Sequence, residues 1–253
     1  RVGVRAMVIH ERDHSLDLGT HGRSVFILDD IRSLRQITTE IAAEKLYFMD
    51  LGPTYFRLNR LSSPFGGAGQ FAGSNPDESA QIVYYMAKRH TFGKMSMKVY
   101  DAEGNLVKTL PAGKSAGINV VSLPTRLPMP KAAPTNNRMA LFGSVFTPTL
   151  EEGTYTVKVE KGKEVYETTI ELLFDPAHET NYPAKDRELS RATQIRLYNM
   201  TNNLGYMYFM LEEMHKQAAD RATGVSKKKL LEQIETFAKE TQAYKESLVS
   251  LEG

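Results

Sequence analysis

Apolar and polar residues alternate in three short runs near the start of the chain, which cover residues 2–8, 16–18 and 25–27. A period of two is typical of a β-strand with one buried face. Turn-forming residues separate the runs at 11–15 and 19–22. The pattern predicts β structure for residues 1 to about 60, including a small antiparallel meander. Such a unit is marginally stable alone, so we expect it to need a neighbouring sheet, supplied by sequence upstream of Arg1.

A second set of period-two runs follows a stretch of glycine and proline at 61–80, which we interpret as a flexible linker. The predicted strands cover residues 82–86, 95–99, 106–110, 117–121, 153–159 and 166–172. Hairpin turns are expected at 101–104 and 161–163. The segment 124–149 contains five prolines and little periodicity. Strands at this spacing, each with one apolar face, fit an immunoglobulin-like sandwich with one long insertion.

From Pro183 the apolar period becomes helical. Two heptad rows predict two helices that pack antiparallel. The rows are Leu197, Met200, Leu204, Met207, Leu211, Met214 and Ala218, then Leu230, Ile234, Phe237, Thr241, Tyr244, Leu248 and Leu251. Gly224 suits the end of the first helix and Ser226 the N-cap of the second. The methionines Met200, Met207 and Met214 are candidates for an adaptable partner-facing surface, although we favour core packing within the hairpin.

The composition excludes several kinds of partner and functional site. A net charge of +2 gives no electrostatic reason to expect nucleic acid, and no apolar run is long enough to span a membrane. The absence of cysteine excludes disulfides, thiolate metal sites and cysteine nucleophiles. Histidines occur without zinc-binding spacing, and no nucleophile elbow is present, so we expect no metal and no cofactor. An arginine at position 1 suggests a piece of a longer protein.

One polar cluster invites a functional reading. Its ligand-binding candidates are Thr20, His21, Arg23, Asp29 and Asp30. A histidine and an arginine together can bind a carboxylate or a phosphate. The two adjacent aspartates point to opposite faces of a strand and do not form an acid–base pair by themselves. We favour a structural role, in which Arg23 locks the turn by hydrogen bonds to Asp29 or Asp30.

The stretches 6–10 and 16–30 resemble the last blade of a bacterial β-propeller family. The most specific part is Gly-Thr-His-Gly-Arg-Ser, followed by an apolar run and Leu-Asp-Asp. These are the sortilin-like, BNR-repeat proteins often labelled putative glycosyl hydrolases. The stretches 99–110, 116–119 and 153–157 resemble an Ig-like module found in this family and in flagellar hook-capping proteins. The sequence departs from the family at Ser122-Leu123-Pro124, where a tryptophan-containing strand is usual, and it lacks Asp-box turns.

The resemblance implies a mainly β plus α fold. Its expected parts are terminal propeller-blade strands over 1–60, the linker over 61–80, an Ig-like β-sandwich over 81–176 and an antiparallel helical hairpin over 177–253. It implies an exported bacterial protein of the periplasm or cell surface. Its partner would be the rest of the same propeller protein, with a further protein or a glycan as a second partner.

The function expected for these residues is that of a non-catalytic C-terminal region that packs on the propeller or on a partner. Two alternatives stay open. The chain could be part of a glycan-cleaving or glycan-binding propeller enzyme, or of a sortilin-like propeller that binds peptides or proteins. In the enzyme alternative, His21 and Arg23 would face the central pocket.

Overall fold

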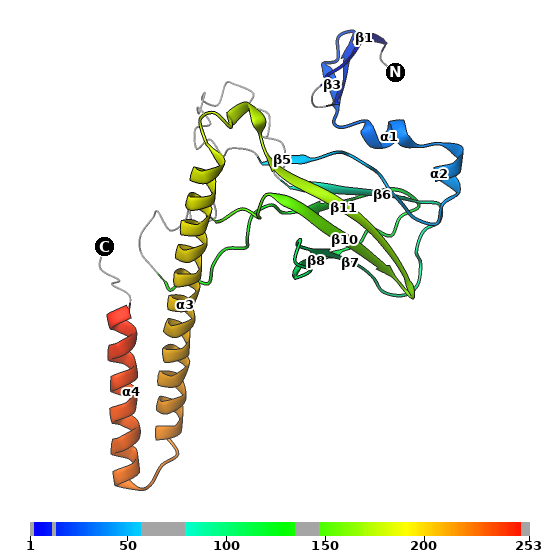
Figure 1. Ribbon diagram of the computed structural model, residues 1–253. Coiled ribbons are helices and arrows are strands. Elements are labelled where there is room, and N and C mark those ends of the chain that lie inside the picture. Colours follow the sequence, from blue (N-terminus) through cyan, green and yellow to red (C-terminus); the bar gives the residue numbers. More distant parts are fainter. Residues whose placement is uncertain (1–2, 12–13, 57–78, 135–146, 249–253) are drawn as a thin grey trace. The chain divides into compact units, whose positions relative to one another are not determined.

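The computed structural model describes residues 3–11, 14–56, 79–134 and 147–248. It contains three small sheets, one of them curled into a half-barrel, and a C-terminal antiparallel helical hairpin (Figure 1). The chain divides into two compact units. The first comprises Arg1–Leu58, Ser62–Thr125 and Glu151–Asp175, and the second Asn59–Leu61, Arg126–Leu150 and Pro176–Gly253. Most of the predicted linker, and Leu251 of the second heptad row, lie outside the described residues.

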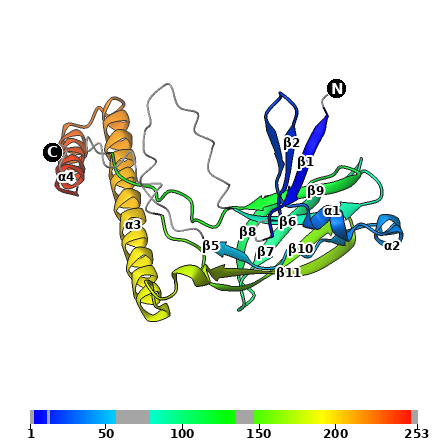
Figure 2. The same cartoon turned by 90° about the horizontal axis from the view of Figure 1, so that it is seen from above.

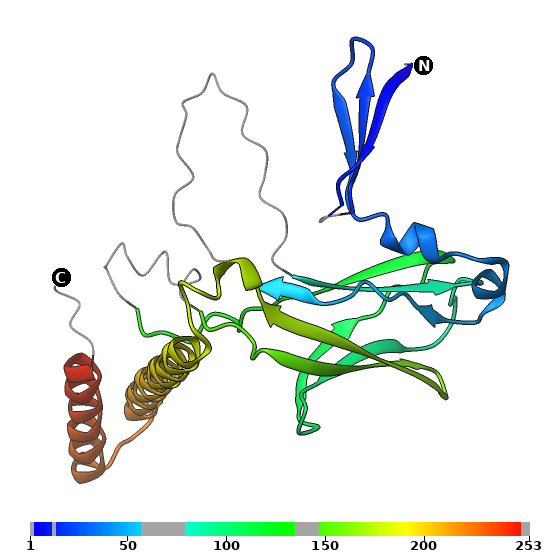
Figure 3. The same ribbon diagram turned by 45° about the horizontal axis from the view of Figure 1, so that its top comes forward.

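The meander predicted at the start of the chain is confirmed. Strands β1 (Val4–Ile9), β2 (Leu16–Thr20) and β3 (Val25–Leu28) form an antiparallel sheet in the order β1-β2-β3 (Figure 3). The β1–β2 register is interrupted between Val4 and Ala6, where one strand carries an irregularity. The arrangement makes β2 the central strand and β1 and β3 the two edges of the sheet.

The expectation of β structure is wrong for residues 32–43. Two short helices lie there, α1 (Arg32–Gln36) and α2 (Thr39–Ala43). Helix α2 begins after Thr38, whose hydroxyl oxygen accepts a hydrogen bond from the Ile41 N–H at 3.3 Å. This N-cap satisfies one of the backbone donors that the first turn leaves unpaired.

The other two sheets contain the core of the first unit, and one lies over the other (Figure 3). The five-stranded sheet has the order β5-β11-β10-β7-β8 and the three-stranded sheet the order β4-β6-β9. Their bounds are β4 (Tyr47–Phe48), β5 (Thr54–Phe56), β6 (Ala80–Met86), β7 (Met95–Tyr100), β8 (Leu106–Pro111), β9 (Gly117–Leu123), β10 (Gly153–Lys161) and β11 (Glu164–Phe174).

Burial in these two sheets follows the period of two that the sequence shows. In β7 and β10, buried and half-buried residues alternate. The largest fully buried side chains of the core are Tyr84, Ile82, Met86, Met97, Leu123, Leu172, Val99, Val157 and Val159. Strand β6 is nearly continuous in its burial, because β4 and β9 flank it and the second sheet covers it.

A buried asparagine fixes the loop before β9. The Asn119 amide accepts a hydrogen bond from the Ser115 N–H at 3.0 Å and donates to the carbonyl oxygens of Ser115 and Gly117 at 2.8 and 3.1 Å. A β-carbon at Gly113 would lie 2.6 Å from Asn119 Oδ1, so only glycine fits there. The Tyr84 hydroxyl donates to the Gly113 carbonyl at 2.6 Å, and burial raises the pKa of Tyr84 to about 12.

The helical hairpin is also confirmed, as the main element of the second unit. After a 3₁₀ turn at Pro176–His178, helix α3 (Ala184–Ala222) and helix α4 (Lys228–Leu248) pack against each other (Figure 2). Thr223 is the C-cap of α3, directly before Gly224. Helix α4 begins at Lys228, and the Lys227 carbonyl accepts the Leu230 and Leu231 N–H groups, so Ser226 is one residue too early to be its N-cap.

Candidate functional site

The polar residues near the start of the chain lie around the β2–β3 turn. Gly22 has φ +76° and Ser24 φ +71°, which allows the chain to reverse within a few residues. The Thr20 hydroxyl donates to the Ser24 carbonyl oxygen at 2.7 Å and so closes this turn. His21 and Arg23 are exposed on it. Both side chains therefore stay in contact with solvent on this turn.

The ion pair at the end of β3 differs from the expected one. Asp30 pairs with Arg32 and not with Arg23, through a bidentate contact of 2.8 Å to Nε and 2.7 Å to Nη2. The Arg32 backbone N–H adds a third hydrogen bond at 3.1 Å. Asp30 has φ +46°, a left-handed conformation that aspartate tolerates better than most residues. Asp29 is exposed beside it.

The charge state of Asp30 follows from this pairing. Burial raises the pKa of the Asp30 carboxyl, but the side-chain and backbone hydrogen bonds from Arg32 and the Arg32 charge outweigh it. The pKa is therefore lowered from 3.8, and Asp30 is ionised near neutral pH. A carboxylate held by a bidentate arginine suits a structural lock at the end of the meander better than proton transfer.

Apolar side chains are exposed on both edge strands of this first sheet. They are Val4, Met7, Val8 and Ile9 of β1 and Val25, Phe26, Ile27 and Leu28 of β3. Successive residues of a strand point to opposite faces, so four consecutive apolar residues in β3 make both faces apolar. In a strand with one face in solvent, apolar and polar residues alternate along the sequence. In a strand covered on both faces, the residues are apolar in a continuous run. Strand β3 therefore has the composition of a strand covered on both faces, although all four of its residues are exposed.

The contact between the helices follows the predicted rows in part. Tyr208 and Ala218 of α3 and Thr241 of α4 are buried. His215 Nδ1 lies 2.9 Å from the Ala238 carbonyl oxygen, and Lys245 Nζ lies 3.9 Å from Glu212 Oε1. On α3, Tyr208 and His215 contact α4 although each lies one residue beyond a predicted position, while Ala218 of the predicted row is buried.

Part of the predicted row on α3 lies on the surface. Met200 and Met207 are 57% and 51% exposed, so the prediction that they pack within the hairpin is wrong. For Ala218 and Thr241, which the same rows placed in the contact, it is confirmed. We define the methionine face by its exposed apolar residues, which are Met200, Met207, Met210 and Met214 of α3 and Leu230, Phe237 and Tyr244 of α4.

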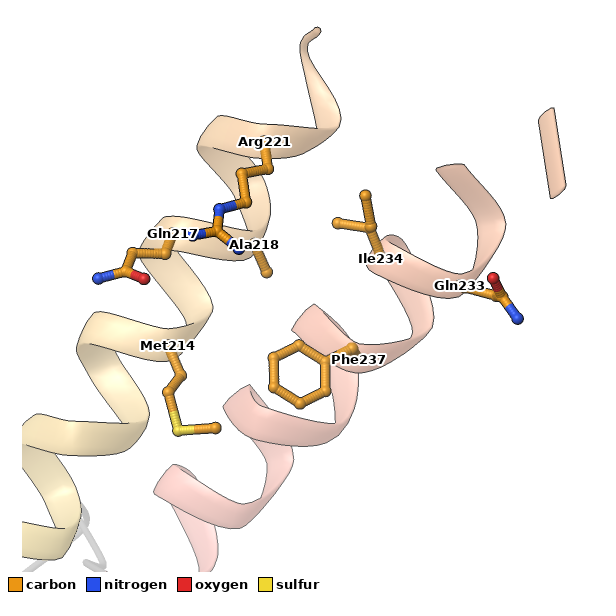
Figure 4. Close-up of a pocket in the computed structure, with 7 residues that line it drawn as sticks. All are labelled: Met214, Gln217, Ala218, Arg221, Gln233, Ile234 and Phe237. Carbon is orange, nitrogen blue, oxygen red and sulfur yellow. The ribbon is translucent and has the colours of Figure 1, made fainter. Parts of the chain in front are cut away.

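The two helices contribute to this face side by side. In Figure 4, Met214 and Ala218 of α3 point toward Phe237 and Ile234 of α4, while Gln217 points away. Together with Arg221 and Gln233, these residues line a groove of ≈ 350 Å³ between the helices. The groove is open and its lining is mostly apolar.

The contact between the segment 126–134 and helix α3 was not predicted from the sequence. The segment 126–134 crosses α3 at Gly205, where a β-carbon would overlap the Lys131 carbonyl oxygen. The Lys131 N–H donates to Asn202 Oδ1 at 2.7 Å, and Lys131 Nζ lies 4.4 Å from the centre of the Phe209 ring. The sequence does contain one sign of this contact. A glycine inside a long helix costs about 1 kcal/mol relative to alanine, so its presence indicates that another part of the chain comes close there.

Two further properties bear on the class of site. Within the described ranges, no helix combines the length and apolarity that crossing a membrane requires. In the same part of the chain, histidine, aspartate and glutamate side chains do not gather in groups of three that could hold a metal ion.

No family model matches the chain, and no curated protein matches it either. Among solved structures, one described as "Biofilm associated protein - BSP domain" superposes with a TM-score of 0.25 and 10% sequence identity. The match covers 64% of this chain and 19% of that one, so the chain spans about a fifth of its length. A superposition at this TM-score does not establish a shared fold.

Proposed function

We propose that this chain is a non-catalytic structural and interaction region, the C-terminal part of an exported bacterial β-propeller protein. In this proposal β1–β3 belong to the last blade, and the two stacked sheets are an Ig-like module of the hook-capping type. The helical hairpin packs on the propeller or on a partner. The protein acts in the periplasm or at the cell surface.

The observation that supports it best is the two-sided apolar character of β3. In a propeller, each blade packs against its neighbours on both faces, so its strands must be apolar on both sides. Phe26 and Ile27 are adjacent and therefore lie on opposite faces, and they are 56% and 62% exposed. Neighbouring blades are the partners that would cover both faces of such a sheet.

The polar residues support a non-catalytic role. His21 and Arg23 stand exposed on a turn, and Asp30 is engaged by Arg32. Catalysis of glycan cleavage needs two carboxyls held across one sugar, at roughly 5–9 Å. We expect His21→Ala and Arg23→Ala in the longest natural form of the protein to leave any glycan turnover unchanged, and a loss of turnover without loss of stability would favour the enzyme alternative.

Hydrogen exchange tests the proposed blade. In residues 1–253 alone, the amides of β1–β3 should exchange much faster than those of β10, because solvent reaches both faces and both edges of the sheet. In a longer chain that carries the remaining blades, the same amides should become protected. Equal protection of β1–β3 and β10 in the 253-residue chain would contradict the proposal.

Two substitutions sharpen this test. Phe26→Ser and Ile27→Ser remove apolar side chains from opposite faces of β3. Both should leave the unfolding of the 253-residue chain unchanged and improve its solubility. Both should destabilise the longer chain by about 2–5 kcal/mol, as for truncation of a buried large apolar residue. If only one of them destabilises the longer chain, the sheet is covered on one face and is not an inner part of a propeller.

A further inference from the structure

The methionine face carries the most regular apolar spacing of the hairpin, yet it is exposed. Met200, Met207 and Met214 are seven residues apart. Leu230, Phe237 and Tyr244 repeat the same spacing on α4. A strict seven-residue repeat keeps one row of side chains facing a neighbouring helix along its whole length. The spacing therefore indicates a helical partner in place of a globular surface or a strand.

The two rows lie on the same side of the hairpin. Met214 and Phe237 both line the groove between α3 and α4, and each row extends from there by heptad steps. The row of α3 also continues beyond the reach of α4. Helix α3 has 39 residues and α4 has 21, so α3 is longer by roughly 27 Å at 1.5 Å per residue. Helix α3 thus extends beyond the end of α4.

The apolar area of the face suits a two-fold contact. Its side chains are between 38% and 67% exposed. Large apolar residues offer about 200 Å² each, so the face presents roughly 700 Å² and two copies of it about 1,400 Å². A standard specific interface buries about 1,200–2,000 Å² in total. One face alone, against a flat polar surface, would not bury a comparable apolar area.

Charge permits the face to meet a copy of itself. The seven residues of the methionine face are uncharged. At its margins Arg221 lines one groove and Glu240 lines a neighbouring one on α4, so both signs are present at the rim. The net charge of +2 adds little repulsion between two chains. Closed two-fold symmetry is also the commonest way in which a self-complementary patch is used.

From these observations we propose that the methionine face binds the same face of a second copy of this chain, so that two hairpins form a four-helix bundle. The proposal rests on the proposed interaction role of this region and names the partner of its hairpin. The methionines, which are flexible and polarisable, become the central layer of the bundle. The contacts of α3 with α4 stay as they are in the single chain.

Sedimentation of the 253-residue chain tests the proposal. Between about 1 and 200 µM we expect a monomer–dimer equilibrium, as for a modest apolar interface. Met207→Glu places a carboxylate in the centre of the face and should weaken the dimer at least about tenfold. Ala219→Glu is the matched control. Ala219 is exposed and lies five residues beyond Met214, about 140° further around α3, so it should leave the dimer unchanged.

Cysteine cross-linking gives a second measurement, which does not require the chain to fold with a glutamate at position 207. The chain contains no cysteine, so single replacements report one position each. Met207→Cys and Met214→Cys should give disulfide-linked dimers on oxidation, and Ala219→Cys should not. Far-ultraviolet circular dichroism of each variant shows that the helices are intact.

A chain that stays monomeric over the whole concentration range overturns the proposal, and so does a dimer that Met207→Glu and Ala219→Glu affect equally. Neither result bears on the proposed propeller origin, because the propeller origin is tested by hydrogen exchange of the β1–β3 amides. Conversely, protection of β1–β3 in the 253-residue chain would contradict the propeller origin and leave the dimer prediction unaffected.

Discussion

Replacing Gly205 by alanine separates the stability of helix α3 from the docking of the segment 126–134. Alanine favours the helix by about 1 kcal/mol over glycine. At this position, however, the new methyl group overlaps the Lys131 carbonyl oxygen. Backbone on both sides of the contact leaves no flexible side chain to give way. The segment must therefore move away from α3 while the helix itself gains stability.

The structure sets the size of the effect. Moving the segment breaks the 2.7 Å hydrogen bond from the Lys131 N–H to Asn202, which contributes about 1 kcal/mol. It also removes the Lys131 ammonium from the Phe209 ring, which contributes about 0.5–1 kcal/mol at an exposed site. Together these losses raise the population of the undocked segment by roughly ten- to thirtyfold. Melting of the hairpin should be unchanged or slightly higher.

Hydrogen exchange with peptide resolution distinguishes the two consequences. For Gly205→Ala, exchange should accelerate in peptides covering 127–134 and stay constant or slow down in peptides from α3. Gly224→Ala is the control, because the nearest atom to its new β-carbon is the Arg221 carbonyl oxygen at 3.9 Å. Unchanged exchange at 127–134 in Gly205→Ala would refute the claim that this glycine is required by the close approach of the chain.

Three further predictions concern the first unit. Met97→Ala should lower the free energy of unfolding by about 2–5 kcal/mol in chemical denaturation, because the side chain is fully buried and a cavity remains. Asn119→Ala should lower it by about 1–3 kcal/mol in the same assay, since it removes the hydrogen bonds of the buried Asn119 amide to Ser115 and Gly117. The pKa of Asp30 is lowered in the folded state, so its pairing with Arg32 stabilises above the unfolded value of 3.8 and is lost as pH falls through the folded value. Asp30→Asn should remove this part of the acid dependence in thermal melts between about pH 5 and 2, and an identical pH profile in both proteins would contradict it.

Most strands and both long helices could be predicted from the sequence because their periodicity continues over enough residues. Strands β7 and β10 alternate as a strand with one buried face must, and α3 and α4 sustain a helical period over many turns. Helices α1 and α2 have five residues each, too few to show a period. Their only local signal is the capping threonine at Thr38.

Pairings between residues far apart in the chain could not be predicted, because periodicity describes each segment by itself and not its partner. Strand β5 joins the five-stranded sheet by parallel pairing with the end of β11, more than a hundred residues later in the chain. The Asp30–Arg32 lock was missed for a local reason. Asp30 has a left-handed backbone conformation, which the sequence pattern does not reveal. This conformation lets its carboxylate accept hydrogen bonds from both the side chain and the backbone of Arg32.

The helix contact uses only part of the predicted row on α3, and this bears on the role of the hairpin. Two heptad rows run side by side on α3, one through Met207 and Met214 and one through Tyr208 and His215. Counting apolar residues selects the first row. In the structure His215 of the second row contacts the Ala238 carbonyl oxygen and the centre of the Tyr208 ring lies 5.5 Å from Lys245 Nζ, while Ala218 of the first row is buried. A hairpin that had to be stable alone would gain by burying its methionines in its only contact. Placing them beside that contact stabilises the protein only when another surface covers them, and the proposed second copy of the chain would supply that surface.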